Sequence, residues 1–157
     1  MQAAVQCYSP KIKILIVEDE PSVAMTMRFL LGLAGCEAEI ASTRARAIQL
    51  AQSGSFSLIT LDINLQGANG YDICRELREN SRLRDTPIVF VSGNCNLEDQ
   101  QRGLDAGAAD YITKPFETFE FAPRLLSHIK SFRASDVSDE IADADTEGFC
   151  DSTQRNQ

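Results

Sequence analysis

The segment FSLITLDINLQGANGYDICRELREN (56–80) decides the fold that this sequence predicts. Its first six residues form an apolar run, which is typical of a strand buried on both faces of a parallel sheet. A polar loop at residues 62–69 follows, and residues 71–80 have the apolar spacing of a helix. A buried strand, a loop and a helix in this order predict one β–α unit of an α/β domain.

The same alternation recurs on both sides of this segment. Pro21 suits the first position of a helix and Gly35 its stop, and Ser42 or Thr43 suits the cap of the next helix. Five such units predict a doubly wound α/β domain with a five-stranded parallel sheet in the flavodoxin-like order 2-1-3-4-5. Strands are predicted at 11–17, 38–41, 56–61, 87–91 and 109–113, and helices at about 21–34, 43–53, 71–80, 97–106 and 117–132.

The chain divides into three parts by composition. Residues 1–10 form an N-terminal extension, residues 11–132 the folded domain, and residues 133–157 an acidic, Ser-rich tail with few apolar residues. Residues 134–157 hold seven acids and one base, so most of the net charge of −8 comes from them. The sequence predicts that this tail is flexible, because it has too little apolar surface to order itself by burial.

Composition excludes several classes of protein. The 157 residues are 43% hydrophobic and 24% charged, as in ordinary globular proteins, and no stretch approaches the ~20 apolar residues of a membrane span. No basic stripe is present, so nucleic-acid binding is not expected. The N-terminus lacks a signal-peptide pattern, which predicts a cytoplasmic protein. The five cysteines are widely spaced, which predicts buried thiols rather than disulfides or a zinc site.

Acidic residues follow two of the predicted strands. Glu18 and Asp19 come after the first strand, and Asp62 comes directly after the third. In a doubly wound sheet these strands are neighbours, so the three acids converge at the carboxyl edge. Bare carboxylates there would repel a nucleotide phosphate, and the glycine-rich nucleotide motifs are absent. An all-oxygen ligand set favours Mg²⁺.

Two more strand ends contribute polar groups to the same edge. Ser92 follows the fourth strand with a hydroxyl, and Lys114 follows the fifth with a cation. Together with a metal-bound carboxylate they supply the parts that phosphoryl transfer needs: an oxygen nucleophile, a divalent ion and donors for the phosphoryl oxygens.

These segments resemble the receiver domain of bacterial-type response regulators. The resemblance covers about residues 11–132 and is specific, because four motifs occur in the family's order and spacing. They are ILIVEDE (14–20), SLITLDINLQGANGYDI (57–73), TPIVFVSGN (86–94) and GAADYITKPF (107–116).

The resemblance implies a role for each matching residue. Asp62 is expected to take a phosphoryl group from a histidine kinase or a histidine phosphotransfer protein. Phosphorylation of Asp62 is expected to alter the binding of an unidentified downstream protein to the face formed by the fourth helix, the fifth strand and the fifth helix. Glu18, Asp19, Asp62 and the Asn64 backbone carbonyl are expected to bind Mg²⁺. Lys114 and Ser92 are expected to contact the phosphoryl group. Ser92 and Tyr111 are expected to form the switch pair.

The resemblance also sets expectations for other positions. Lys114 precedes Pro115 in a step that is often cis in the family, and Gln66 stands where the family commonly has proline. Tyr111 is expected to turn from an exposed to a buried position on phosphorylation. The sequence around His128, LLSHIK (125–130), has no adjacent acid, so His128 is expected at the surface, away from the predicted site. No output domain follows these motifs, so the sequence predicts a stand-alone receiver like the chemotaxis regulators, acting as a switch rather than an enzyme.

Two other functions share parts of this pattern. A phosphatase of the haloacid-dehalogenase type also uses a strand-end aspartate, but it needs a general acid two residues later, where this chain has Asn64. A pseudo-receiver, whose state is set by partners instead of phosphate, would not need the complete set of acids, hydroxyl and lysine.

Overall fold

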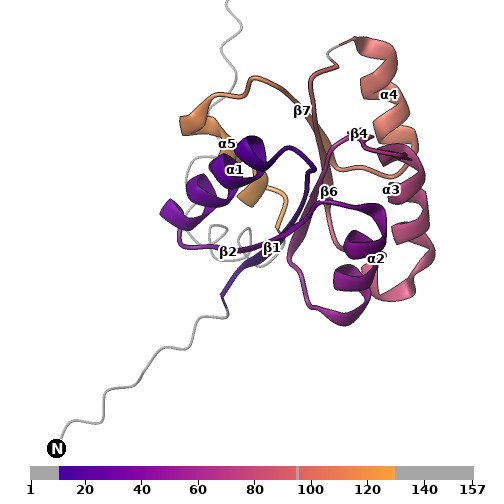
Figure 1. The fold of residues 1–157 in the computed structure, drawn as a ribbon, viewed down its shortest axis with the longest axis horizontal. Helices are drawn as coiled ribbons and strands as arrows, with labels where there is room; N and C mark the ends of the chain where they lie inside the picture. Colours follow the sequence, from indigo (N-terminus) through magenta and orange to yellow (C-terminus); the bar gives the residue numbers. More distant parts are fainter. Residues whose placement is uncertain (1–10, 95, 130–157) are drawn as a thin grey trace, which may run out of the picture.

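The computed structural model describes residues 11–94 and 96–129. They form a five-stranded parallel sheet in the order β2-β1-β3-β6-β7 (Figure 1). This is the predicted order 2-1-3-4-5, because β4 and β5 are a separate hairpin. The sheet strands are β1 (Lys13–Val17), β2 (Glu37–Ala41), β3 (Leu58–Leu61), β6 (Ile88–Ser92) and β7 (Asp110–Thr113).

Helices cover both faces of the sheet, as Figure 1 shows. Buried side chains of α1 and α5 pack with one face, and those of α2 and α3 pack with the other, where Ala106 at the end of α4 joins them. The central strands β1, β3 and β6 are buried on both sides, as their apolar sequences predict. The helices are α1 (Pro21–Leu33), α2 (Arg44–Ser53), α3 (Gly70–Glu79), α4 (Leu97–Asp105) and α5 (Thr118–Leu126), with a 3₁₀ helix at Ser81–Leu83.

Local sequence signals explain where α1 begins and ends and where α2 begins. Pro21 occupies the first turn of α1, and Gly35 after its C-terminus has a φ of 82°, a conformation that glycine adopts without steric cost. Thr43, one of the two predicted caps of α2, accepts a hydrogen bond at 3.2 Å from the Arg46 N–H. These three expectations are confirmed.

The loop predicted at residues 62–69 contains a short antiparallel hairpin. Its strands are β4 (Asn64–Leu65) and β5 (Ala68–Asn69). The sequence prediction missed it because two-residue strands are too short to show alternation. Gly67, at the turn, has a φ of 73°. The hairpin fixes the path of the chain directly after Asp62.

The last helix ends earlier than predicted. α5 stops at Leu126 instead of about residue 132. The hydrogen bonds then change to three-residue spacing, from His128 N–H to the Leu125 carbonyl and from Ile129 N–H to the Leu126 carbonyl. Residues 130–132 lie outside the described residues.

Several other predictions concern residues 1–10, 95 and 130–157, which lie outside the described residues. These are the predictions of an N-terminal extension and of a flexible tail, and those for the thiols of Cys7, Cys95 and Cys150. The cysteines inside the described part, Cys36 and Cys74, are buried free thiols, as predicted. No helix in the described part is both long and apolar enough to span a membrane.

One buried hydroxyl lacks a partner, and this predicts a stabilising substitution. Thr60 in β3 is 0% exposed, and its Oγ1 makes no hydrogen bond. Thr60→Val replaces the hydroxyl by a methyl group of similar size and should raise the free energy of unfolding by about 1 kcal/mol. Urea denaturation measures this. Thr26→Val is the control, because the Thr26 hydroxyl is exposed and bonds the Ser22 carbonyl. Lower stability of Thr60→Val would contradict the prediction.

Candidate functional site

Three acidic side chains meet at the carboxyl edge of the sheet. Val17 at the end of β1 and Leu61 at the end of β3 are partners in the parallel register, so the residues after them lie side by side. One carboxylate oxygen from each of Glu18, Asp19 and Asp62 lies within 4.8 Å of the others. Two ionised carboxylates at this distance repel by about 3 to 4 kcal/mol at an effective dielectric constant of about 20. The predicted acids are therefore together, in a cluster that needs positive charge.

Lys114 reaches this cluster from the end of β7. Its Nζ lies 2.6 Å from Glu18 Oε2 and 3.2 Å from Asp62 Oδ2. Burial alone would lower the pKa of Lys114, but the hydrogen bond to Glu18 and the charges of Asp62 and Glu18 outweigh it and raise that pKa. Burial raises the pKa of Glu18, against the hydrogen bond from Lys114. Lys114 carries one positive charge and contacts two of the three carboxylates, so the described residues leave the site an excess of negative charge.

Backbone N–H groups hold two of the carboxylates in place. Asp62, 7% exposed, accepts a hydrogen bond on Oδ1 from the Asn64 N–H at 3.1 Å. Glu18, 2% exposed, accepts one on Oε1 from the Glu20 N–H at 3.1 Å. The second oxygen of each carboxylate contacts Lys114. The structure thus shows a contact of the Asn64 N–H with Asp62, whereas metal ligation by the Asn64 carbonyl stays a prediction.

Asp19 is held by the hairpin after β3. Its Oδ2 accepts a hydrogen bond at 3.0 Å from the N–H of Gln66, at the hairpin turn. The sequence pointed to Gln66 only as a position where the family commonly has proline. Sequence reasoning missed the contact because a backbone donor leaves no signal in the side-chain pattern.

The chain between Asp62 and α3 makes a tight turn. The Gly70 N–H bonds the Ile63 carbonyl at 2.8 Å, and Asn69 caps α3 by accepting from the Tyr71 N–H at 2.8 Å. A Cβ on Gly70 would lie 2.7 Å from Ile63 Cα and still closer to the Asp62 carbonyl. Glycine at position 70 therefore permits the approach of α3 to the backbone of Asp62.

Ser92 and Tyr111 are joined through Asn94. Ser92 is 0% exposed, and its Oγ accepts a hydrogen bond from the Asn94 N–H at 3.3 Å. The Tyr111 hydroxyl donates to the Asn94 carbonyl at 2.7 Å. The Lys114 N–H bonds the Ser92 carbonyl at 2.8 Å, and the Lys114–Pro115 bond is cis, as the resemblance implied. Asn94 acts through its backbone, so no sequence signal pointed to it.

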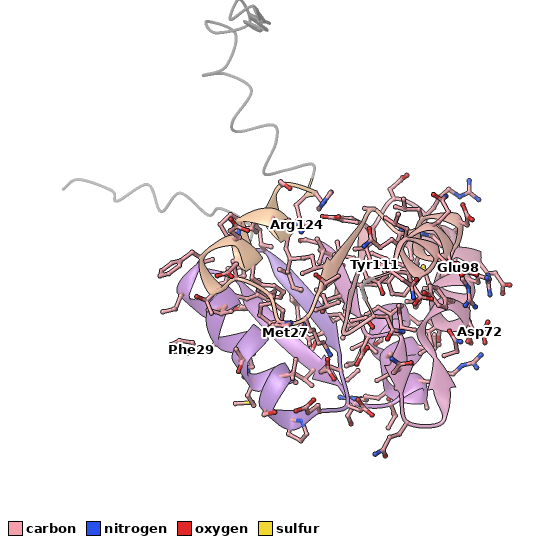
Figure 2. All side chains as sticks on the ribbon, turned by 90° about the horizontal axis from the view of Figure 1, so that it is seen from above. Met27, Phe29, Asp72, Glu98, Tyr111 and Arg124 are labelled. Carbon is pink, nitrogen blue, oxygen red and sulfur yellow. The ribbon has the colours of Figure 1, made fainter. Side chains whose placement is uncertain are left out.

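Tyr111 is already buried, which corrects the expectation that it starts exposed. Tyr111 is 7% exposed, and its side chain lies between β7 and α4 (Figure 2). Gly103 in α4 allows this position, because a Cβ there would lie 2.9 Å from the Phe90 ring and 3.3 Å from the Tyr111 ring. The sequence could not predict this, since the ring position depends on how closely α4 packs.

His128 is also placed differently from the expectation. It was predicted at the surface without an adjacent acid, but its side chain is 20% exposed and its Nε2 lies 3.0 Å from Asp110 Oδ2. Asp110 also pairs with Arg124 Nε at 2.7 Å. The acid comes from β7, so the local sequence around His128 could not reveal it. The contacts of Asp110 with Arg124 and His128 link α5 and the turn after it to β7, away from the acidic cluster.

This arrangement predicts a loss of stability in acid. Burial would raise the pKa of Asp110, but hydrogen bonds from Arg124 and His128 outweigh it and hold that pKa at about 2. A depressed carboxyl pKa stabilises the fold fully above the unfolded pKa, near 4, and this contribution disappears as the pH falls from about 4 toward 2. The contribution of Asp110 to the free energy of unfolding above pH 4 is on the order of 2 kcal/mol.

Asp110→Asn should therefore flatten the dependence of stability on pH between about 4 and 2. Denaturation with urea at several pH values measures this. Asp72→Asn is the control, because Asp72 is exposed on α3. An equal slope in wild type and Asp110→Asn would contradict the prediction.

The cluster has the chemistry of a site for a hard divalent cation. Glu18, Asp19 and Asp62 offer only oxygen ligands, and a divalent ion would match their excess of negative charge. Neither histidine nor cysteine belongs to the group, so the donor set fits Mg²⁺ better than zinc or copper. The residues that are present therefore fit the predicted ion.

A family model described as the response regulator receiver domain matches residues 14–126. The chain belongs to this family. Response regulator ArlR of Staphylococcus saprophyticus is 36% identical over 118 residues, which are 75% of this chain and 52% of ArlR. The uncharacterized transcriptional regulatory protein YkoG of Bacillus subtilis is 34% identical over 117 residues, 74% of this chain and 50% of YkoG. This receiver chain spans about half the length of the curated relatives it matches.

Solved receiver structures agree with this fold. The chemotaxis response regulator CheY4 of Vibrio cholerae has a TM-score of 0.72 and 28% identity, covering 76% of this chain and 99% of CheY4. The receiver domain of the sensor histidine kinase PA1611 of Pseudomonas aeruginosa has a TM-score of 0.69 and 28% identity, covering 74% of this chain and 96% of that one. The PA1611 structure has a magnesium ion coordinated in its active site cleft.

Proposed function

We propose that Asp62 accepts a phosphoryl group from a phosphohistidine of a kinase or a phosphotransfer protein, in a reaction that depends on Mg²⁺. The observation that carries the proposal is the place of Asp62. Its carboxylate is nearly buried at the carboxyl edge of the sheet, where the Asn64 N–H holds it and the Lys114 ammonium lies 3.2 Å away. An oxygen nucleophile beside a fixed cation suits phosphoryl transfer.

In this reaction an Asp62 carboxylate oxygen attacks phosphorus. The O–P bond forms as the P–N bond of the phosphohistidine breaks, and the histidine nitrogen keeps the bonding electrons. Lys114 compensates charge on the phosphoryl oxygens. Glu18, Asp19, Asp62 and the Asn64 carbonyl would hold Mg²⁺, which supplies the remaining positive charge. The raised pKa of Lys114 keeps its ammonium charged for this role.

A pocket beside the site offers a place for the donor protein. It lies between the start of α1 and the segment that joins β7 to α5, with a volume of about 500 Å³. Val23, Pro115 and Phe116 give it an apolar lining, and Lys114 borders it. An amphipathic helix carrying the phosphohistidine would bury its apolar side there, next to Asp62.

We also propose how phosphorylation changes the surface. The new phosphoryl oxygens draw the Ser92 hydroxyl inward, which removes the acceptor now used by the Asn94 N–H. Asn94 also accepts from the Tyr111 hydroxyl, so its movement reaches β7 and α4. Tyr111 starts buried, so the change repositions a buried tyrosine. Such coupling is typically about 1 to 3 kcal/mol, and a target on the α4–β7–α5 face would bind about 5 to 150 times more tightly.

The test of the proposal is labelling by a small-molecule phosphodonor. Wild type incubated with acetyl phosphate and Mg²⁺ should gain one phosphoryl group in its intact mass, and EDTA should prevent this. The adduct should be labile in mild base, as an acyl phosphate is. No adduct in Mg²⁺, or an equal yield in EDTA, would contradict the proposal.

The proposed change of the surface is tested with beryllofluoride, which mimics the phosphoryl group. Beryllofluoride should tighten the binding of the target protein to wild type, and should do so much less for Ser92→Ala.

A further inference from the structure

The turn of the β4–β5 hairpin contacts one of the metal-site acids through its backbone. Gln66 N–H donates to Asp19 Oδ2 at 3.0 Å, across 47 positions of sequence. The Gln66 side chain is exposed, so the contribution of this residue to the site is its N–H. Among residues 11–94 and 96–129, the Gln66 N–H is the group that donates a hydrogen bond to the Asp19 carboxylate.

The geometry of the turn would accept a residue without an N–H. Gln66 and Gly67 are its two central residues, and the positive φ of Gly67, with none at Gln66, matches a type II turn. Proline is favoured at the first central position of this turn. The preceding residue, Leu65, lies in β4, and an extended residue is compatible with a following proline. The backbone therefore permits proline at position 66, and the feature that proline would remove is the donor to Asp19.

This N–H is also not needed by the turn itself. In a β-turn the internal hydrogen bond runs from the fourth residue, here Ala68, to the carbonyl of the first, here Leu65. The N–H of the first central residue takes no part in it. The Gln66 N–H is therefore directed to the site and not used to close the hairpin.

Hydrogen bonds to ligating carboxylates orient them for the metal. Glu18 and Asp62 each have a backbone donor and Lys114 to hold them, whereas Asp19 has the Gln66 N–H. One fixed oxygen restricts the rotation of the Asp19 carboxylate before any ion binds. Removal of such outer contacts typically weakens metal binding about 10- to 100-fold.

We propose that the backbone N–H of Gln66 is a positioning group that orients Asp19 and thereby raises the Mg²⁺ affinity of the site. The proposal rests on the Mg²⁺ site of the proposed function. It assigns a specific role to the backbone of Gln66, whose side chain is exposed.

The test compares two substitutions at one position. Gln66→Ala keeps the N–H and Gln66→Pro removes it, while both remove the exposed side chain. Isothermal titration calorimetry with MgCl₂ should give wild-type affinity for Gln66→Ala and an affinity about tenfold weaker for Gln66→Pro. Thermal unfolding without Mg²⁺ should show Gln66→Pro at least as stable as Gln66→Ala, because proline fits the turn. Equal Mg²⁺ affinities of the two variants would overturn the proposal.

A second measurement does not depend on the folding of the proline variant. In wild type without Mg²⁺, the Gln66 amide should exchange slowly with solvent, and Asp19→Ala should raise its rate at least about tenfold, since the turn gives no other protection. An unchanged exchange rate would also overturn the proposal. Failure of the proposed function looks different: wild type would bind Mg²⁺ and differ from Gln66→Pro in affinity, yet would take no label from acetyl phosphate.

Discussion

Asp62→Asn is expected to abolish labelling by acetyl phosphate while leaving the fold intact. The amide keeps the size of the carboxylate, but it loses the charged nucleophilic oxygen and one Mg²⁺ ligand. It also removes one of the two carboxylates that contact the Lys114 ammonium. With less like-charge repulsion beside Glu18, the variant should be no less stable than wild type.

The measurement is intact mass after incubation with acetyl phosphate and Mg²⁺, with urea denaturation of the same sample as the check on folding. Asp105→Asn serves as the matched control, since Asp105 is an exposed residue at the end of α4 and should label like wild type. If Asp62→Asn still took up one phosphoryl group per chain, the acceptor would be a different residue.

Gly70→Ala is expected to damage both the fold and the site. The added Cβ would lie 2.7 Å from Ile63 Cα and would meet the backbone carbonyl of Asp62, and backbone atoms cannot turn aside as a side chain can. Overpacking of this kind costs about 1 to 3 kcal/mol, and we expect the upper part of that range. Relief would require α3 to move away or the Asp62 loop to shift, and either would misplace the Asp62 carboxylate.

Urea denaturation and the rate of labelling measure the two effects of Gly70→Ala. Gly32→Ala is the control, because a Cβ at this position in α1 would meet no atom within 4 Å. It should gain up to about 1 kcal/mol from helix propensity and keep the wild-type labelling rate. Wild-type stability together with a wild-type labelling rate in Gly70→Ala would show that the close approach of α3 to Asp62 is not required.

The order of the sheet and the acidic cluster could be predicted from the sequence because both depend on local patterns. Apolar runs such as residues 56–61 identify buried strands, and right-handed crossovers then leave few arrangements for five β–α units. Any residue that follows β1 or β3 must lie at the shared edge. Glu18, Asp19 and Asp62 were therefore placed together without knowledge of a single contact.

Tertiary packing alone decided the contacts that involve backbone groups or the approach of one element to another. The Gln66 N–H meets Asp19 only because a two-residue hairpin folds toward the first loop. Tyr111 is buried because Gly103 lets α4 pack against its ring, and His128 finds Asp110 across α5 and β7. Side-chain periodicity reports which face is apolar, but a backbone donor is the same in nearly every residue and a rotamer depends on its neighbours. These features therefore required the folded chain.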